Sequence, residues 1–96
     1  MAEVLGEGDI REALSELGGW AYEGDALVWT RSFRSFAEAF AFTTRVALLA
    51  ERRDHHPDIM LSYTRLALRV TTHDAGGVTA RDIGFAGAVN AFLPAG

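Results

Sequence analysis

The sequence predicts an α+β fold in the order α-ββ-α-ββ-α, a four-stranded antiparallel sheet with helices packed on one face. Two pairs of short apolar segments separated by turns indicate the sheet, and three segments with apolar residues at helical spacing indicate the helices. Ninety-six residues, 49% of them hydrophobic, suffice for one compact core and not for two. We therefore expect a single domain over residues 1–96.

The first helix is expected over residues 9–17. Asp9 can cap its N-terminus, and Gly18 and Gly19 can end it. The apolar residues that recur at helical spacing are Ile10, Ala13, Leu14 and Leu17.

Two hairpins are expected, one from strands at residues 20–22 and 26–33 and one from strands at residues 59–63 and 66–72. Gly24 tolerates the positive φ that the first hairpin turn requires. The fourth strand shows a period of two, with its apolar set at Leu66, Leu68 and Val70.

The central helix is expected to begin after Ser35, a good N-cap with Glu38 at the third helical position, and to run to about Arg53. Pro57 disfavours the helical conformation at His56, so the helix must end just before the histidine pair. Its apolar arc spans about half the circumference, which is wide for a surface helix. One part can cover the sheet and the remainder can pack against another subunit.

The two parts of this arc follow from the helical period. Phe36, Phe40, Ala47 and Ala50 are expected on one face, with Phe42, Val46 and Leu49 beside them.

The last helix follows a loop at residues 74–78. Thr79 can cap it, and Asp82 at the third position completes a capping box. The residues expected on its buried side are Ile83, Ala86, Val89 and Phe92.

The composition excludes several classes of function. The chain has no cysteine, which excludes disulfides and thiol chemistry. No apolar run approaches the roughly 20 residues that span a bilayer, and no signal peptide is visible, so we expect a cytoplasmic protein with no membrane partner. The net charge is −4 and no basic stripe is present, so we expect no nucleic-acid partner.

All three histidines lie in two short segments, residues 51–58 and 72–79, each beside a carboxylate. Histidine gives and takes protons near neutral pH, so this concentration indicates acid–base chemistry. If the predicted elements pack as expected, the end of the central helix meets the end of the fourth strand. That arrangement places His55, His56 and His73 around one concavity.

Other interpretations of these residues compete. The histidine pair can simply end a helix, where a cation is favourable. Three histidines with Glu51 or Asp74 can form a metal site, but the spacing matches no common ligand signature. A hydrolase triad is disfavoured because Ser62 lies within a strand and lacks a nucleophile-elbow pattern.

The carboxylates allow two interpretations each. Glu51 lies four residues before His55 and can orient it, or can be a solvated helix-end residue. Asp74 can hold the glycine loop or fix the tautomer of His73. Asp82 has a complete explanation as a capping residue.

These residues resemble a known family. The pattern Glu51-x-x-x-His55-His56-Pro57-Asp58, then Tyr63, then Thr72-His73-Asp74-Ala75-Gly76-Gly77-Val78-Thr79-x-x-Asp82, is similar to the pterin-4a-carbinolamine dehydratases. Residues 36–40 and 45–51 resemble the central helix of that family, and the similarity covers roughly residues 30–92. Two departures stand out: Asp54 replaces a common Asn, and Ile59 replaces the Trp of many animal members.

The resemblance implies the same α-ββ-α-ββ-α fold, a homodimer or homotetramer, and no metal or organic cofactor. It implies removal of water from 4a-hydroxytetrahydrobiopterin to give quinonoid dihydropterin, a step that recycles the cofactor of aromatic amino-acid hydroxylases. The catalytic histidines would be His55, His56 and His73. The substrate would contact residues 55–57 and 72–75, that is His55, His56, Pro57, Thr72, His73, Asp74 and Ala75.

The chemistry suits this set, because one imidazolium can protonate the leaving hydroxyl while one neutral imidazole accepts a ring proton. We expect His55 and His73 to be the acid–base pair and His56 to bind and orient the pterin. Glu51 and Asp82 would support them. Two alternatives stay open: a non-catalytic binding or regulatory partner of the same fold, and a dehydratase-like enzyme for another pterin, such as a molybdopterin-related compound.

Overall fold

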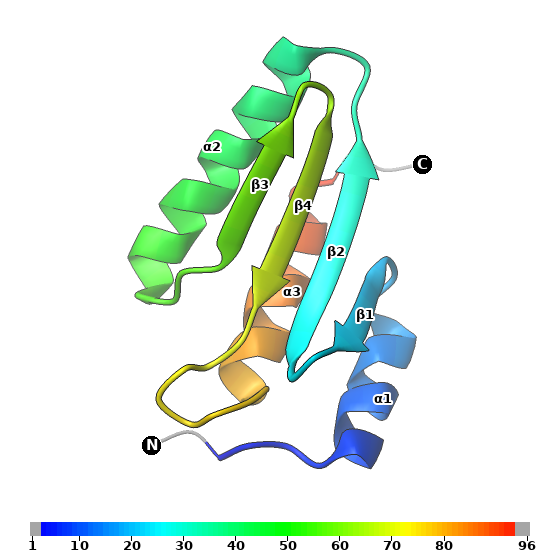
Figure 1. Cartoon of the computed structure of the whole chain (residues 1–96), viewed down its shortest axis with the longest axis vertical. Coiled ribbons are helices and arrows are strands. Elements are labelled where there is room, and N and C mark those ends of the chain that lie inside the picture. The colour runs from blue at the N-terminus through cyan, green and yellow to red at the C-terminus, as the bar shows by residue number, and fades with distance from the viewer. Residues whose placement is uncertain (1–2, 94–96) are drawn as a thin grey trace.

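The computed structural model describes residues 3–93 and confirms the predicted element order (Figure 1). The elements are α1 (Glu7–Glu16), β1 (Trp20–Glu23), β2 (Ala26–Ser32), α2 (Phe36–Arg53), β3 (Asp58–Ser62), β4 (Arg65–Val70) and α3 (Ala80–Ala91).

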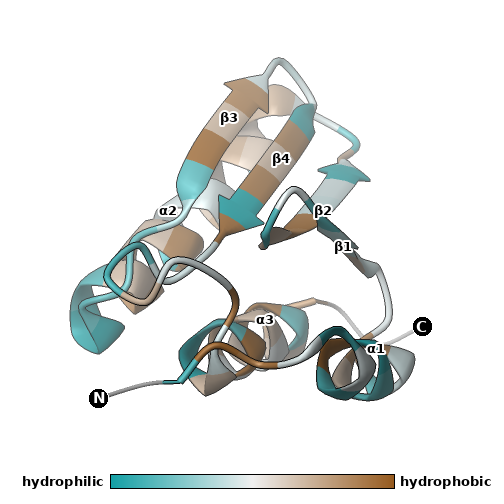
Figure 2. Cartoon of the chain, turned by 60° about the horizontal axis from the view of Figure 1, so that its bottom comes forward, coloured by the Kyte–Doolittle hydropathy of each residue, from teal (hydrophilic) through white to brown (hydrophobic). Residues whose placement is uncertain are grey.

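The four strands form one antiparallel sheet in the order β1-β2-β4-β3. The register aligns one apolar row across all four strands, in which Trp29 lies opposite both Trp20 and Leu68, and Leu68 lies opposite Ile59. The three helices lie on one side of the sheet (Figure 2). The predicted sheet with helices on one face is therefore confirmed.

One hydrophobic core lies between the sheet and the helices. β1, β2 and β4 contribute alternating residues to it, and the apolar bands of β4 are visible in Figure 2, whereas β3, at the edge of the sheet, contributes only the half-buried Leu61. The core residues of α2 are Phe42, Val46, Leu49 and Ala50, and those of α3 are Phe85, Ala86 and Val89.

The ends of α2 follow from its sequence. Ser35 accepts a hydrogen bond from the Glu38 backbone N–H at 3.1 Å, as predicted. At the other end Asp54 adopts a left-handed conformation, with φ 49°. The His55 N–H then reaches back to the Ala50 carbonyl at 3.0 Å, while the Asp54 N–H bonds to Glu51, which is a Schellman motif. The helix therefore ends just before the histidine pair.

The predicted capping box of α3 is confirmed. The Thr79 N–H donates to Asp82 Oδ2 at 2.8 Å, and the Thr79 hydroxyl accepts from the N-terminus of the helix. On the predicted buried side, Ala86 and Val89 are fully buried and Ile83 and Phe92 are half-buried against the core, while the fully buried Phe85 was not predicted.

Two other expectations were wrong in detail. α1 begins at Glu7 after an extended Gly6 with no side-chain cap, so Asp9 lies within the first turn. There its charge still favours the positive end of the helix dipole. On α2, Ala50 was expected on the same face as Phe36 and Phe40. Ala50 is instead buried in the core, whereas Phe36 and Phe40 are exposed.

Within residues 3–93, no helix combines the length and apolar character needed to cross a bilayer.

Candidate active site

A polar hollow of about 190 Å³ opens where the C-terminal end of α2 meets the C-terminal end of β4 and the start of α3. All three histidines line it, so the predicted concavity is present. The complete lining is Asp54, His55, His56, Thr71, Thr72, His73, Asp74 and Arg81.

The two adjacent histidines that follow the turn at Asp54 differ in burial and in their partners. The His55 side chain is 7% exposed, and its ring meets the edge of Phe85 with 6.2 Å between ring centroids. The His56 side chain is 56% exposed. One imidazole is thus fixed in the protein wall while the other stands at the rim of the hollow.

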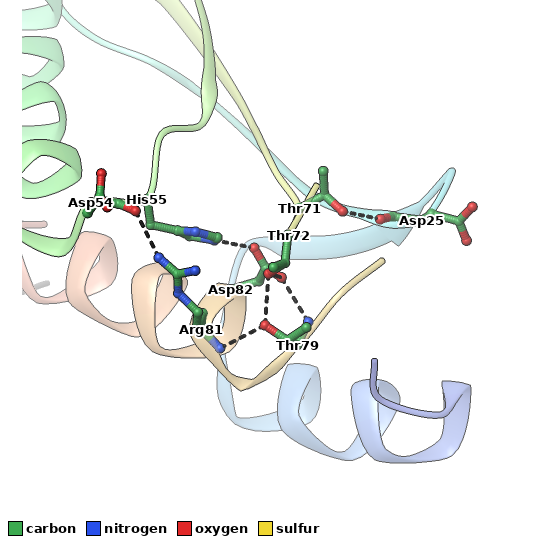
Figure 3. A network of polar contacts seen from close by, with 8 residues as sticks. All are labelled: Asp25, Asp54, His55, Thr71, Thr72, Thr79, Arg81 and Asp82. Atoms are coloured by element: carbon green, nitrogen blue, oxygen red, sulfur yellow. Dashed lines mark hydrogen bonds and ion pairs between the residues drawn. The ribbon is translucent and has the colours of Figure 1, made fainter. Parts of the chain in front are cut away.

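Asp82 is fully buried and holds His55 in place (Figure 3). Its Oδ1 lies 2.6 Å from His55 Nε2. Its Oδ2 accepts from the Thr72 hydroxyl at 2.7 Å and from the Thr79 N–H at 2.8 Å. Because the one Thr72 proton is used on Asp82, the Thr79 hydroxyl must donate to Thr72 across their 2.8 Å contact. No buried side-chain polar atom of this network lacks a hydrogen-bond partner.

This network fixes the tautomer of His55. An ionised carboxylate only accepts hydrogen bonds, so His55 Nε2 carries the proton that Asp82 Oδ1 receives. In the neutral imidazole the other nitrogen, Nδ1, is then a proton acceptor. No polar side-chain atom in residues 3–93 is both buried and unpaired, and His55 lines the hollow, so this geometry leaves Nδ1 available to a ligand in the hollow.

Glu51 partners His56 and not His55, which corrects the expected contact. Glu51 Oε2 lies 2.5 Å from His56 Nε2, and both side chains are largely exposed. The expected spacing of four residues applies only inside a helix. Because α2 ends at Arg53, the left-handed turn at Asp54 brings His56, five residues after Glu51, within hydrogen-bonding distance of Glu51.

His73 is exposed on the loop that follows β4. The Thr72 carbonyl closes this loop by accepting from the N–H groups of Ala75 and Gly76, at 3.1 and 3.0 Å. Asp74 lines the hollow beside His73, but no hydrogen bond joins the two side chains in the described part of the chain. Asp74 therefore does not set the tautomer of His73 in this structure.

Two of the expected contact residues lie outside the lining of the hollow. Pro57, directly after the histidine pair, and Ala75, in the loop, are both half-buried. Their effect on the hollow comes through the backbone, because Pro57 fixes the chain after His56 and Ala75 helps to close the loop.

The sequence did not predict that Arg81 and Thr71 line the hollow. Arg81 lines the hollow, and its Nη2 donates to the Asp54 carbonyl at 2.8 Å, which ties α3 to the turn that ends α2. Thr71 donates to the Asp25 carbonyl at 2.7 Å and so ties β4 to the first hairpin (Figure 3). The only available signal for Arg81 was its place directly before Asp82.

A larger hollow of about 500 Å³ lies near the N-terminal end of α2, but it contains no histidine. The smaller hollow is the candidate site for acid–base chemistry, because all three histidines line it. Among residues 3–93, no three His, Asp or Glu side chains are grouped so that they could hold a metal ion.

Comparison with known proteins identifies the family of the chain. The family model of pterin 4 alpha carbinolamine dehydratase matches residues 3–92. A Thermomicrobium roseum protein named "Putative pterin-4-alpha-carbinolamine dehydratase" is 52% identical over 82 residues, which are 85% of this chain and 88% of that protein. A Rhodopseudomonas palustris protein of the same name is 52% identical over 93 residues, covering 95% of this chain and 92% of that protein.

Two solved structures share the fold. A transcriptional coactivator/pterin dehydratase from Brucella melitensis superposes with a TM-score of 0.89 at 37% identity, covering 93% of this chain and 97% of that one. A pterin dehydratase-like protein described as a RuBisCO assembly factor in the alpha-carboxysome gives a TM-score of 0.65 at 26% identity, covering 76% and 87%. From the match over residues 3–92 and these relatives, the chain belongs to the pterin-4α-carbinolamine dehydratase family.

Proposed function

We propose that this protein is a 4a-hydroxytetrahydrobiopterin dehydratase that releases water and quinonoid dihydropterin by histidine acid–base catalysis. The observation that carries the proposal is the convergence of three imidazoles on one hollow, one of them oriented by a buried carboxylate.

The reaction needs two proton transfers. An imidazolium donates a proton to the C4a hydroxyl, the C–O bond breaks, and water leaves with the bonding electrons. A ring N–H gives its proton to a neutral imidazole, and its electrons complete the new double bond. The two histidines exchange protonation states and return to the starting state through solvent.

We assign the two transfers to His55 and His73. His55 suits the role of base, because Asp82 holds its Nε2 proton and leaves Nδ1 to accept. His73, exposed in the lining of the same hollow, would then be the acid. His56, held by Glu51 at the rim, would bind and orient the pterin. Thr72, Asp74 and the backbone around Pro57 and Ala75 would shape the remaining contacts.

The test is stopped-flow decay of freshly generated 4a-hydroxytetrahydrobiopterin with the native protein and with His55→Ala and His73→Ala. General acid–base catalysis contributes about 10²–10⁴-fold, so each variant should fall to within a small factor of the spontaneous rate. Arg52→Ala, an exposed change on the last turn of α2, should keep the native rate. Native activity in both histidine variants would refute the assignment.

A second candidate function is that of a non-catalytic binding partner. It is favoured by the exposed Phe36, Phe40 and Leu48 on α2, which are 48%, 54% and 56% exposed. The RuBisCO assembly factor also shows that this fold serves assembly in another protein. Decay at the spontaneous rate with folded native protein would favour this candidate.

We further propose that these α2 residues contact another subunit in a homodimer or homotetramer, since exposed apolar patches mark association sites. Sedimentation velocity at several protein concentrations tests this, and a monomer at all of them would contradict it.

In a cell with an aromatic amino-acid hydroxylase, the dehydratase would recycle that enzyme's pterin. Loss of tyrosine formation from phenylalanine on deletion of the gene would support the link.

A further inference from the structure

The hollow of about 500 Å³ lies between the C-terminal end of β2 and the first half of α2. This is the opposite end of α2 from the histidines (Figure 1). α2 has 18 residues, so at about 1.5 Å per residue its two ends lie roughly 25 Å apart. The hollow is therefore separate from the proposed active site, and the proposed dehydration makes no use of it.

Positive charge is concentrated around this hollow. Arg31, Arg34 and Arg45 line it together with one carboxylate, Glu38, which pairs with Arg34 at 3.5 Å. Three arginines against one glutamate leave two positive charges in excess, in a chain whose net charge is −4. In the described part of the chain, neither Arg31 nor Arg45 has a carboxylate partner.

Aromatic rings hold two of these arginines. The Arg45 guanidinium carbon lies 4.4 Å from the centroid of Phe92, and that of Arg31 lies 5.9 Å from the centroid of Phe33. Both distances are within the range of cation–π interaction. Stacking restrains guanidinium groups, so less side-chain entropy is lost when they bind an anion.

The other part of the lining is aromatic. Phe33 and Phe42 both line the hollow, and their ring centroids are 5.3 Å apart. Phe42 is 7% exposed and belongs to the core, so its ring is fixed, and the half-buried Phe33 that packs on it provides the accessible aromatic surface. A flat apolar body can therefore lie against a rigid aromatic surface while its charged group reaches the arginines.

We propose that this hollow is a second binding site, for a small aromatic carboxylate. The excess of positive charge selects an anion, and the planar guanidinium matches a carboxylate. The phenylalanine wall selects an aromatic body over a bare inorganic anion. The volume lies within the roughly 300–1,000 Å³ of small-molecule sites.

The experiment titrates ¹⁵N-labelled native protein with 2-naphthoate, which serves as the probe, and follows the amide signals. Matched titrations use 2-naphthamide, which has the same shape without the charge, and inorganic phosphate, which has the charge without the ring. Arg31→Gln and Arg45→Gln remove the proposed contacts. Arg11→Gln removes an exposed arginine on α1, paired with Glu7, and is the control.

We expect saturable shifts at residues 31–45 with 2-naphthoate, and about tenfold weaker binding in Arg31→Gln and Arg45→Gln. Arg11→Gln should bind like the native protein. The variants are at exposed positions, so folding is not at risk. The proposal is overturned if 2-naphthamide or phosphate binds as well as 2-naphthoate, if the shifts centre on residues 54–56 and 71–74, or if no saturable binding occurs.

Discussion

Asp82 combines two roles in one side chain. Its Oδ2 caps α3 by accepting from the Thr79 N–H, and its Oδ1 orients His55. The spacing from Thr79 explains the cap completely, so the sequence offered no sign of the contact with a residue 27 positions earlier. Only the family resemblance placed Asp82 beside the histidines.

The first prediction concerns the stability that Asp82 provides. Asp82→Ala leaves three buried donors without an acceptor, from His55, Thr72 and Thr79. We expect the free energy of unfolding to fall by about 3 kcal/mol, measured by urea denaturation. Asp74→Ala, on the exposed loop of the same hollow, should change it by less than about 0.5 kcal/mol. Equal losses in the two variants would show that the buried network is unimportant for stability.

The second prediction concerns Glu51. Both members of the Glu51–His56 pair are largely exposed, so Glu51→Gln should leave the free energy of unfolding within about 0.5 kcal/mol of the native value. If His56 binds and orients the pterin, KM should rise about threefold while kcat stays nearly constant. Steady-state kinetics with both parameters resolved checks this. A lower kcat at unchanged KM would instead assign His56 to the proton transfers.

At the scale of elements, the turn after α2 decides which histidine is buried. Asp54 adopts φ 49°, a conformation that Asn and Asp tolerate better than other residues with a side chain. The Asn that is common here in the family suits the same geometry. Asp54 in place of Asn is therefore compatible with the same turn.

The third prediction follows from this turn. Asp54→Ala should lower the free energy of unfolding by about 1 kcal/mol, because alanine disfavours the left-handed region. Asp54→Gly should raise it by a few tenths of a kcal/mol or leave it unchanged, because glycine adopts this region without strain. The Arg81 hydrogen bond goes to the backbone carbonyl and stays in both variants. Thermal unfolding of the three proteins checks the order, and a more stable Asp54→Ala would contradict it.

The sequence predicted the caps of α2 and α3 because cap chemistry is local. It misplaced the start of α1, because Gly6 begins that helix without a side-chain hydrogen bond. It also extended the third strand to Tyr63, which in fact lies in the hairpin turn with φ 53°. A bulky residue rarely adopts that conformation, and no local pattern predicts it.

At the scale of the whole molecule, the site combines elements that are distant in the sequence. The hollow lies between the end of α2, the end of β4 and the start of α3. The predicted topology brought the three histidines together, because the helix end and strand end meet at one edge. It could not orient the side chains, since their directions depend on the turn at Asp54 and on burial against Phe85.

The fourth prediction is that residues 1–96 form a single domain. Trp20 and Trp29 stack in the core with ring centroids 6.0 Å apart, so their fluorescence reports on tertiary packing. A single domain of this size should unfold in one cooperative transition, with a free energy on the order of 5–10 kcal/mol. Urea curves from fluorescence and from far-ultraviolet circular dichroism should coincide. Separate midpoints would indicate more than one folding unit.

The central claim is that the buried Asp82–His55 pair drives dehydration, and Asp82→Asn tests it most directly. Asparagine keeps the shape of Asp82 but offers one acceptor oxygen to three donors, so it no longer fixes the tautomer of His55. The measurement is single-turnover decay of 4a-hydroxytetrahydrobiopterin at a temperature where circular dichroism shows the variant folded. We predict a rate constant at least about 100-fold below that of the native protein. A folded Asp82→Asn protein that reacts at the native rate would contradict it.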